Sequence, residues 1–179
     1  KVTDSAGNVM TSTSVPATNI STGSAIVIDT TAPTVTSFTS TTTDGTYNND
    51  ISKGLGNTVN ITAITSEDVV SGNTITVTLD TGATVVLTAA ANGTTLVGTY
   101  NVSALDTSSD LTVNSFSIGT VTDSAGNVMT STSVPATNIS TGSAIVPDTT
   151  ASTATSITST TTYRTYPTDI SRLLHTTYN

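Results

Sequence analysis

Apolar and polar residues alternate along several short segments of the chain, as they do in strands that bury one face. The clearest case is Thr74–Leu79, where Ile75, Val77 and Leu79 alternate with threonines. No long segment carries apolar residues at helical spacing. The alternation predicts about seven strands, over Thr34–Thr42, Val59–Thr65, Thr74–Leu79, Thr84–Ala90, Leu96–Val102, Leu111–Ile118 and Ala144–Val146.

Segments rich in Gly, Asn and Asp separate these predicted strands and indicate turns. Asn92 and Gly93 favour a type I′ hairpin, because both residue types tolerate the positive φ that this turn requires. Within Leu111–Ile118 the apolar positions change phase between Val113 and Phe116, which predicts a bulge or a bend. Further loops are predicted at Asp44–Asn57, Asp80–Gly82 and Asp123–Asn127.

The composition supports an all-β fold. Threonine makes up about a quarter of the chain, and β-branched side chains suit pleated strands better than helices. Two packed sheets are an economical way to bury one apolar face from each of about seven strands. We therefore expect an antiparallel β-sandwich, although the cysteines and the tryptophan of antibody domains are absent.

An internal repeat sets the expected domain organisation. The sequence of Val2–Val27 recurs without a change at Val121–Val146, an offset of 119 residues. This period matches the size of one independent domain, about 100–150 residues. We expect the C-terminal end of one repeat in residues 1–29, a complete repeat in residues 30–148 and the truncated start of the next in residues 149–179.

The two copies diverge after the identical stretch. Of the 33 positions that follow it, 13 differ, and they include glycines that the predicted loop needs for its turns. Gly45, Gly54 and Gly56 are replaced by Arg164, Leu173 and His175. We expect a truncated or damaged tail, and we expect both partial repeats to be poorly ordered or to borrow an edge of the complete one.

Charge and residue content exclude several functions. The chain has 12 acidic against 4 basic residues, a net charge of −8, which disfavours nucleic acid and anionic membranes as partners. It has no cysteine, and no apolar run is long enough to span a bilayer. The only histidine, His175, lies outside the complete repeat, so a Ser-His-Asp triad cannot form within that repeat.

The triplet Asp80-Thr81-Gly82 resembles the active-site turn of retroviral-type aspartic proteases. That chemistry needs two aspartates that share a proton. The same triplet also fits an ordinary hairpin turn with glycine in the left-handed position. Because no flap-like segment accompanies it, we interpret it as a turn and expect the chain not to be an enzyme.

Two motifs carry a resemblance to a known family. Asp29-Thr-Thr-Ala-Pro33 and Asp123-Ser-Ala-Gly-Asn127 resemble the junction and the D-x-A-G-N loop of the Ig-like tandem repeats of large bacterial surface adhesins. Ile61–Glu67, followed by Ile75–Gly82, is similar to their middle strands. The resemblance implies an Ig-like sandwich, exposed on or secreted from a bacterial cell, whose partners are neighbouring repeats and an unidentified surface ligand.

The resemblance also implies calcium at the junctions between modules. Calcium binds about six to eight oxygen ligands, mostly from carboxylates and carbonyls. The matching positions are Asp29 and Asp148 at the linkers, and Asp123-Asn127 and Asp4-Asn8 in the loop. Glu67, Asp106 and Asp110 join them if the loops converge, and we include Glu67 among the expected ligands. The alternative is turn chemistry, since Asp and Asn stabilise tight turns by bonding to their own backbone.

These observations favour a structural or adhesive module that acts as a stalk or spacer. Repetition adds length without new chemistry, which suits that role. The alternative is a carbohydrate- or ligand-binding β-sandwich domain of a secreted enzyme. That alternative predicts a patch of exposed aromatic side chains, and aromatic residues make up only 4% of the chain.

Overall fold

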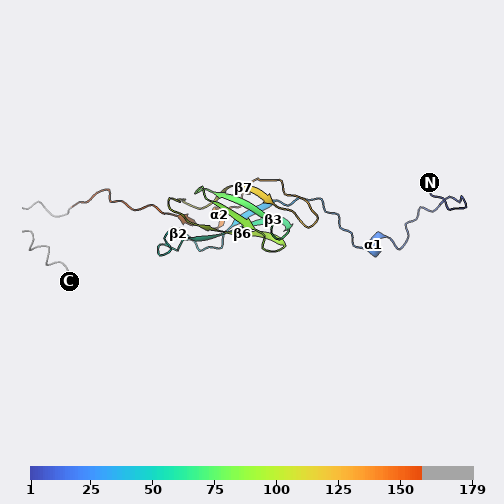
Figure 1. The fold of residues 1–179 in the computed structure, drawn as a ribbon, viewed down its shortest axis with the longest axis horizontal. Helices are drawn as coiled ribbons and strands as arrows, with labels where there is room; N and C mark the ends of the chain where they lie inside the picture. The colour runs from blue at the N-terminus through green and yellow to red at the C-terminus, as the bar shows by residue number, and fades with distance from the viewer. Residues whose placement is uncertain (159–179) are drawn as a thin grey trace, which may run out of the picture. The chain divides into compact units, whose positions relative to one another are not determined.

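The computed structural model describes residues 1–158, and contacts divide the chain into two compact units, Lys1–Thr149 and Thr150–Asn179. Nearly all regular structure is β, so the all-β prediction is confirmed (Figure 1). The strands are β1 (Val35–Thr39), β2 (Gly45–Tyr47), β3 (Thr58–Val69), β4 (Thr74–Leu79), β5 (Thr84–Thr88), β6 (Gly93–Asn101), β7 (Val113–Thr120) and β8 (Ile145–Pro147). Two single helical turns, α1 (Ile20–Gly23) and α2 (Ile139–Gly142), complete the described elements.

Six strands form one curled antiparallel sheet in the order β1-β3-β6-β5-β4-β7. Although β1 and β7 are its opposite edges, the rings of Phe38 and Phe116 lie only 5.6 Å apart in an edge-to-face contact. The pairing of β3 with β6 changes register between Ile64 and Val69, and such irregularities bend a sheet. The sheet is therefore a half-barrel with a seam between its two edge strands.

The core fills the inside of this curl. In β4 the apolar residues Ile75, Val77 and Leu79 are buried, while the threonines between them are half-buried. The same period of two places Leu96 and Tyr100 of β6 in the core. Strand alternation thus places the apolar face of each strand on the same side, which is what holds the sheet in its curled form.

Residues 121–146 lie across the seam, and we call them the closing segment. The N–H of Phe38 in β1 donates to the carbonyl of Thr137 at 3.1 Å. On the other edge, Asn138 accepts from the N–H of Val113 in β7 and donates to its carbonyl, both at 2.9 Å. One short stretch therefore satisfies backbone groups of both edge strands.

The closing segment also completes the core. Its side chains Val121, Met129, Ile139 and Ile145 are at most 2% exposed. Burial of one such side chain contributes about 1.5–3 kcal/mol. The segment ends in β8, which pairs in parallel with β2 and forms a small second sheet.

Every predicted strand is found, although several bounds shift and one short strand was missed. β3 continues past its predicted end at Thr65 to Val69, and β4 has the predicted bounds. The short β2 lies inside Asp44–Asn57, which the sequence predicted as a loop. Its three residues are extended because they pair with β8, a partner from the far end of the repeat that local sequence does not reveal.

The predicted bulge in β7 is confirmed, whereas the type I′ geometry predicted at Asn92-Gly93 is wrong, although this segment does connect the antiparallel strands β5 and β6. Thr78 pairs with Ser115 and Leu79 with Val113, so one extra residue of β7 lies between the two pairs. A type I′ turn requires positive φ at both central residues. In the described part of the chain Leu105 is the only non-glycine residue with positive φ. Asn92 instead accepts the N–H of Ser71 at 2.9 Å and so ties two turns together.

The leading segment (residues 2–27) repeats the local structure of the closing segment but buries nothing. Thr3 bridges to Val9 as Thr122 bridges to Val128. Asn19 at α1 and Asn138 at α2 each form a capping box. The four apolar side chains that match the buried set are exposed: Val2 by 62%, Met10 by 63%, Ile20 by 70% and Ile26 by 65%.

The leading segment borrows no edge of the complete repeat in the part of the chain that the structure describes. Its hydrogen bonds run within the segment itself. In the complete repeat, Gly45, Gly54 and Gly56 have positive φ, as the predicted turns require. Their divergent counterparts Arg164, Leu173 and His175 lie outside the described residues.

Candidate metal centre

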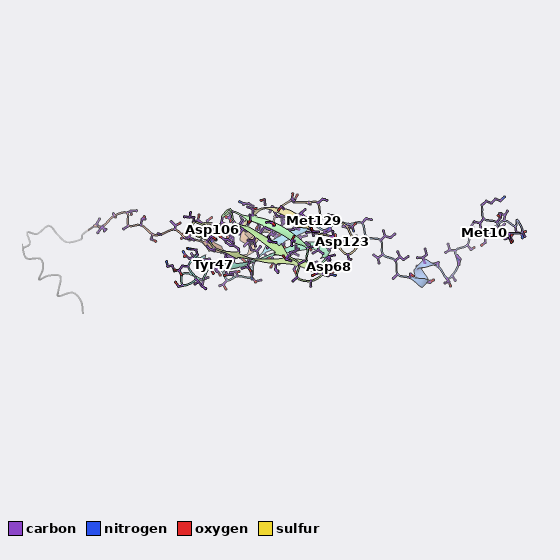
Figure 2. The ribbon with its side chains drawn as sticks, in the orientation of Figure 1. Met10, Tyr47, Asp68, Asp106, Asp123 and Met129 are labelled. Carbon is purple, nitrogen blue, oxygen red and sulfur yellow. The ribbon has the colours of Figure 1, made fainter. Side chains whose placement is uncertain are left out.

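Three carboxylates from separate segments meet at one end of the module. Asp29 precedes β1, Glu67 lies in β3 and Asp123 belongs to the closing segment. One carboxylate oxygen from each lies within 4.8 Å of the other two. Figure 2 shows Asp123 at this end of the module, together with Asp68, the chain neighbour of Glu67. We call these three residues the acidic cluster.

A tight loop surrounds the carboxylate of Asp123 with hydrogen-bond donors. The side chain is only 4% exposed, and its Oδ1 accepts the N–H of Asn127 at 2.8 Å. Its Oδ2 accepts the side-chain amide of Asn127 at 2.7 Å. Burial raises the pKa of Asp123, but the hydrogen bonds from Asn127, Gly126 and Ala125 together outweigh it and leave the pKa below its ordinary value.

Glu67 has an oxygen that could accept a further ligand, as does Asp110 outside the cluster. Its Oε1 is shielded from solvent and has no hydrogen-bond partner. Burial raises the pKa of Glu67, and the negative charges of Asp29 and Asp123 raise it further. A partly desolvated carboxylate beside two others is a place where a cation, or a proton on Glu67, relieves both repulsion and desolvation.

Asp29 brings the linker into the cluster. Its side chain is exposed, and Oδ1 accepts the N–H of Thr31 at 2.9 Å. Its backbone carbonyl accepts the side-chain amide of Asn127 at 3.2 Å. Asn127 thus acts here as a hydrogen-bond donor that ties the linker to the Asp123 loop, and it holds two candidate ligands in place.

The structure separates Asp148 from the acidic cluster. Asp148 forms an isolated antiparallel β-bridge with Thr107, and its N–H donates to the carbonyl of Tyr47 at 2.9 Å. Figure 2 shows Tyr47 at the end of the module opposite Asp123. Of the five predicted ligand positions, the structure therefore brings Asp29, Glu67, Asp123 and Asn127 together and leaves Asp148 at the other end, where it precedes the next repeat.

The further candidates also lie outside the cluster. Asp106 accepts the hydroxyl of Tyr100 at 2.7 Å and lies near the Tyr47 end (Figure 2). Burial and this hydrogen bond raise the pKa of Tyr100. Asp110 lies in the loop before β7, and Asp4 forms an exposed copy of the Asp123 loop with Asn8.

The donor set of the cluster suits a hard divalent cation. All its side-chain donors are carboxylate oxygens, the ligands that calcium and magnesium prefer over the nitrogen and sulfur ligands of zinc. Lys53, the only base in residues 30–148, pairs instead with Asp50 at 3.4 Å. No lysine or arginine of the complete repeat therefore neutralises the cluster, and the three carboxylates could hold a metal ion.

The Asp80-Thr81-Gly82 triplet forms a turn between β4 and β5. Gly82 has a φ of 86°, the left-handed conformation that the hairpin interpretation predicts. The carboxylate of Asp80 accepts hydrogen bonds from the hydroxyl of Ser108 and from the N–H of Thr112. Asp80 thus anchors the loop that leads into β7.

No protein-family model, no curated protein and no solved structure matches this chain. In the residues that the structure describes, neither helix has the length and apolar character needed to cross a membrane.

Proposed function

We propose that this chain is a structural or adhesive repeat of a bacterial surface or secreted protein, and that a divalent cation holds its junctions. Calcium is the cation that the resemblance of the junction motifs implies, and its ligands would be Asp29, Glu67 and Asp123. The observation that carries the proposal is the position of this cluster, because it joins the linker to the body of the module. A cation there would hold the entering chain against the module and stiffen the junction.

The exact repeat extends this argument along the array. Asp148 occupies the sequence position of Asp29 in the second copy, at the exit of the complete module. The next junction would therefore place Asp148 against the Glu67 and Asp123 equivalents of the following repeat. Three further parts of the proposal rest on the junction and loop motifs: the role as stalk or spacer, the Ig-like sandwich architecture and the position outside the cell. The curled antiparallel sheet and its small second sheet support them.

The burial of aromatic residues counts against the carbohydrate-binding alternative. Sugar-binding surfaces depend on exposed aromatic rings. In the described part of the chain, Phe38, Tyr47, Tyr100 and Phe116 are each at most 6% exposed. The stalk or spacer proposal therefore has the stronger support.

Thermal melting with calcium or with a chelator tests the cation. A ligand that binds only the folded state raises the melting midpoint. We expect calcium to raise the midpoint of the full chain, and Glu67→Gln to abolish most of that rise. Asp68→Asn is the matched control, because Asp68 is an exposed acid next to Glu67 and is not part of the cluster. No rise in the full chain, or an equal rise in Glu67→Gln, would remove the cation from the proposal.

A two-module chain tests the spacer itself. Two copies of residues 30–148 in tandem place Asp148 at a complete junction. We expect X-ray scattering to give a larger and more sharply defined maximum dimension with calcium than with chelator. The same dimension in both conditions would contradict a cation-stiffened junction, and a compact side-by-side pair would contradict the spacer.

A further inference from the structure

The last strand of the module, β8, pairs in parallel with β2. At the start of this pair the Gly45 N–H donates to the Ala144 carbonyl at 2.9 Å. At its end the Asp148 N–H donates to the Tyr47 carbonyl, also at 2.9 Å. The two strands are therefore tied at both ends of their ladder, and both run toward the point where the chain leaves the module.

The opposite side of β8 is bonded to the loop that precedes β7. The Leu111 N–H donates to the Ile145 carbonyl at 2.8 Å, and the Ser108 N–H donates to the Pro147 carbonyl at 3.0 Å. The side chain of Ile145 is fully buried in the core. β8 thus lies between two backbone partners, and it cannot slide along its own direction without breaking bonds on both sides.

The chain enters and leaves the module at opposite ends. Asp29 lies in the acidic cluster with Asp123, whereas Asp148 follows β8 at the end that carries Tyr47 (Figure 2). Tension applied through these two points pulls β8 lengthwise past β2. The hydrogen bonds on both sides of β8 then share the load and must break together, whereas strands that are pulled apart from one end lose their bonds one at a time.

We propose that β8 is the mechanical clamp of the module, the strand whose release limits unfolding when the chain is stretched. A stalk carries tension along its length, so the use of the clamp rests on the proposed function. The clamp itself consists of backbone hydrogen bonds and a buried side chain, and it needs no cation.

The clamp protects the seam of the curled sheet. Tension that enters at Asp148 reaches β8 before it reaches Asn138 and Thr137, whose bonds hold the two edge strands. These bonds carry no load from the exit as long as β8 stays in place. Once β8 is released, the load reaches them directly, so the module opens in a single step.

The entry side of the module is the stronger of the two. β1 has five residues against three in β8, and tension from Asp29 also pulls it lengthwise along its partner β3. Thr34 adds two bonds to Ser66, one to its backbone N–H and one to its hydroxyl, at 2.9 and 3.0 Å. The shorter strand at the exit therefore sets the unfolding force.

Single-molecule stretching of the full chain in two directions tests the clamp. The chain has no cysteine, so paired substitutions to cysteine give defined points of attachment. Ile28→Cys with Ile157→Cys pulls the module lengthwise, and Ile51→Cys with Ile157→Cys pulls β2 and β8 apart from the exit end. All three isoleucines are at least 79% exposed. The loop of Ile51 lies at the exit, because the Asn48 side-chain amide donates there to the Asp148 carbonyl at 2.7 Å.

We expect the lengthwise unfolding force to be several times the force in the second direction, with chelator present and at the same loading rate. The free energy of unfolding is nearly the same for the two exposed cysteine pairs, whereas forced unfolding reports the barrier along the direction of pull. We also expect one rupture that releases the whole of residues 30–148. Equal forces in the two directions would overturn the proposal.

A substitution at the end of the ladder locates the clamp. Asp148→Pro removes the N–H that donates to Tyr47, so we expect it to lower the lengthwise force. Thr30→Pro is the matched control, since in the described part of the chain the Thr30 N–H takes part in no hydrogen bond. Equal lengthwise forces in the two variants would place the limiting strand elsewhere and overturn the proposal.

These outcomes are separate from those that test the proposed function. A clamp that persists in chelator while calcium leaves the melting midpoint unchanged would remove the cation and keep the clamp. Equal forces in the two directions would remove the clamp and leave the scattering test of the spacer as it stands. If Asp148→Pro fails to fold, as its circular dichroism would show, the comparison of directions still decides, because it changes no residue of β8.

Discussion

The effect of a substitution on the stability of this protein depends on the surroundings of the residue. The exact repeat makes this dependence measurable, because it places the same residue in two environments. Gly126 and Gly7 occupy the same position in two identical loops, with φ of 92° and 87°. No atom lies within 4 Å of a Cβ added at either position, so a substitution adds backbone strain alone. The loop at Gly126 is part of the folded module, whereas the loop at Gly7 is exposed.

We predict that Gly126→Ala destabilises the module while Gly7→Ala does not. An L-residue in the left-handed region costs about 1–2 kcal/mol, and only the first loop couples that cost to global unfolding. Chemical denaturation of both variants, with chelator present, measures the difference. An equal loss of stability in the two variants would mean that the leading segment unfolds together with the module.

At the scale of single residues the sequence predicted most of the candidate site. Asp29, Asp123 and Asn127 came from local motifs, because each motif is a continuous run of five residues. Glu67 was also named, although its closeness to Asp29 depends on the pairing of β1 with β3, and its closeness to Asp123 on the hydrogen bond from the Val70 N–H to the Thr122 carbonyl. Asp148 shares the motif of Asp29 but lies at the opposite end of the module. The module has a complete junction where the chain enters it, and where the chain leaves it contributes only the linker side of the next junction.

Strands were predicted best where alternation is regular and the partner is close in sequence. β4 and β5 alternate cleanly, and both were found with their buried faces. β2 was missed because three residues carry no periodicity and their partner is β8. α2 was missed because four residues cannot show a helical pattern, although Asn138 followed by Thr141 forms a capping box that a search for helix caps would find.

Gly98 differs in its role from Gly126, because two strands approach each other closely at its position. Gly98 in β6 lies against β5, and a Cβ there would meet the Val86 carbonyl oxygen at 2.5 Å and the Leu87 Cδ2 at 2.6 Å. The carbonyl oxygen belongs to the sheet backbone and cannot retreat. The glycine therefore allows β5 and β6 to pack at this spacing.

We predict that Gly98→Ala destabilises the module by about 1–3 kcal/mol, the usual range for overpacking. Gly142→Ala is the matched control, because Gly142 ends α2 and nothing lies within 4 Å of its added Cβ. Alanine is favoured over glycine in a helix, so this control should be neutral or slightly stabilising. Urea denaturation midpoints give both values, and a Gly98→Ala variant as stable as the control would contradict the close approach.

For the whole molecule, the acidic cluster makes stability depend on pH and on cations together. The pKa of Glu67 is raised in the folded state above its ordinary value of 4.5, so folded chains bind more protons there than unfolded chains. The contribution of Glu67 to the free energy of unfolding is fully present below pH 4.5 and is lost as the pH rises through the pKa that Glu67 has in the folded state. Asp123 acts in the opposite sense, since its lowered pKa stabilises the fold above its ordinary range and that contribution is lost on acidification.

We predict that chelated protein loses stability as pH rises above 4.5, and that Glu67→Gln removes this loss. With saturating calcium the sign reverses, because the cation requires an ionised Glu67 and binds more tightly as pH rises. Denaturation at a series of pH values, with calcium and with chelator, checks both statements. A pH profile of Glu67→Gln that matches the unmodified chain would show that Glu67 does not titrate in the cluster.

The order in which the module is built follows from the position of the closing segment at its C-terminal end. A ribosome completes all six strands of the curled sheet before it adds residues 121–146. At about 5–20 residues per second, the open seam then waits for about one to five seconds. A nascent array therefore reaches its final fold one module at a time, each in the seconds after its last strand emerges.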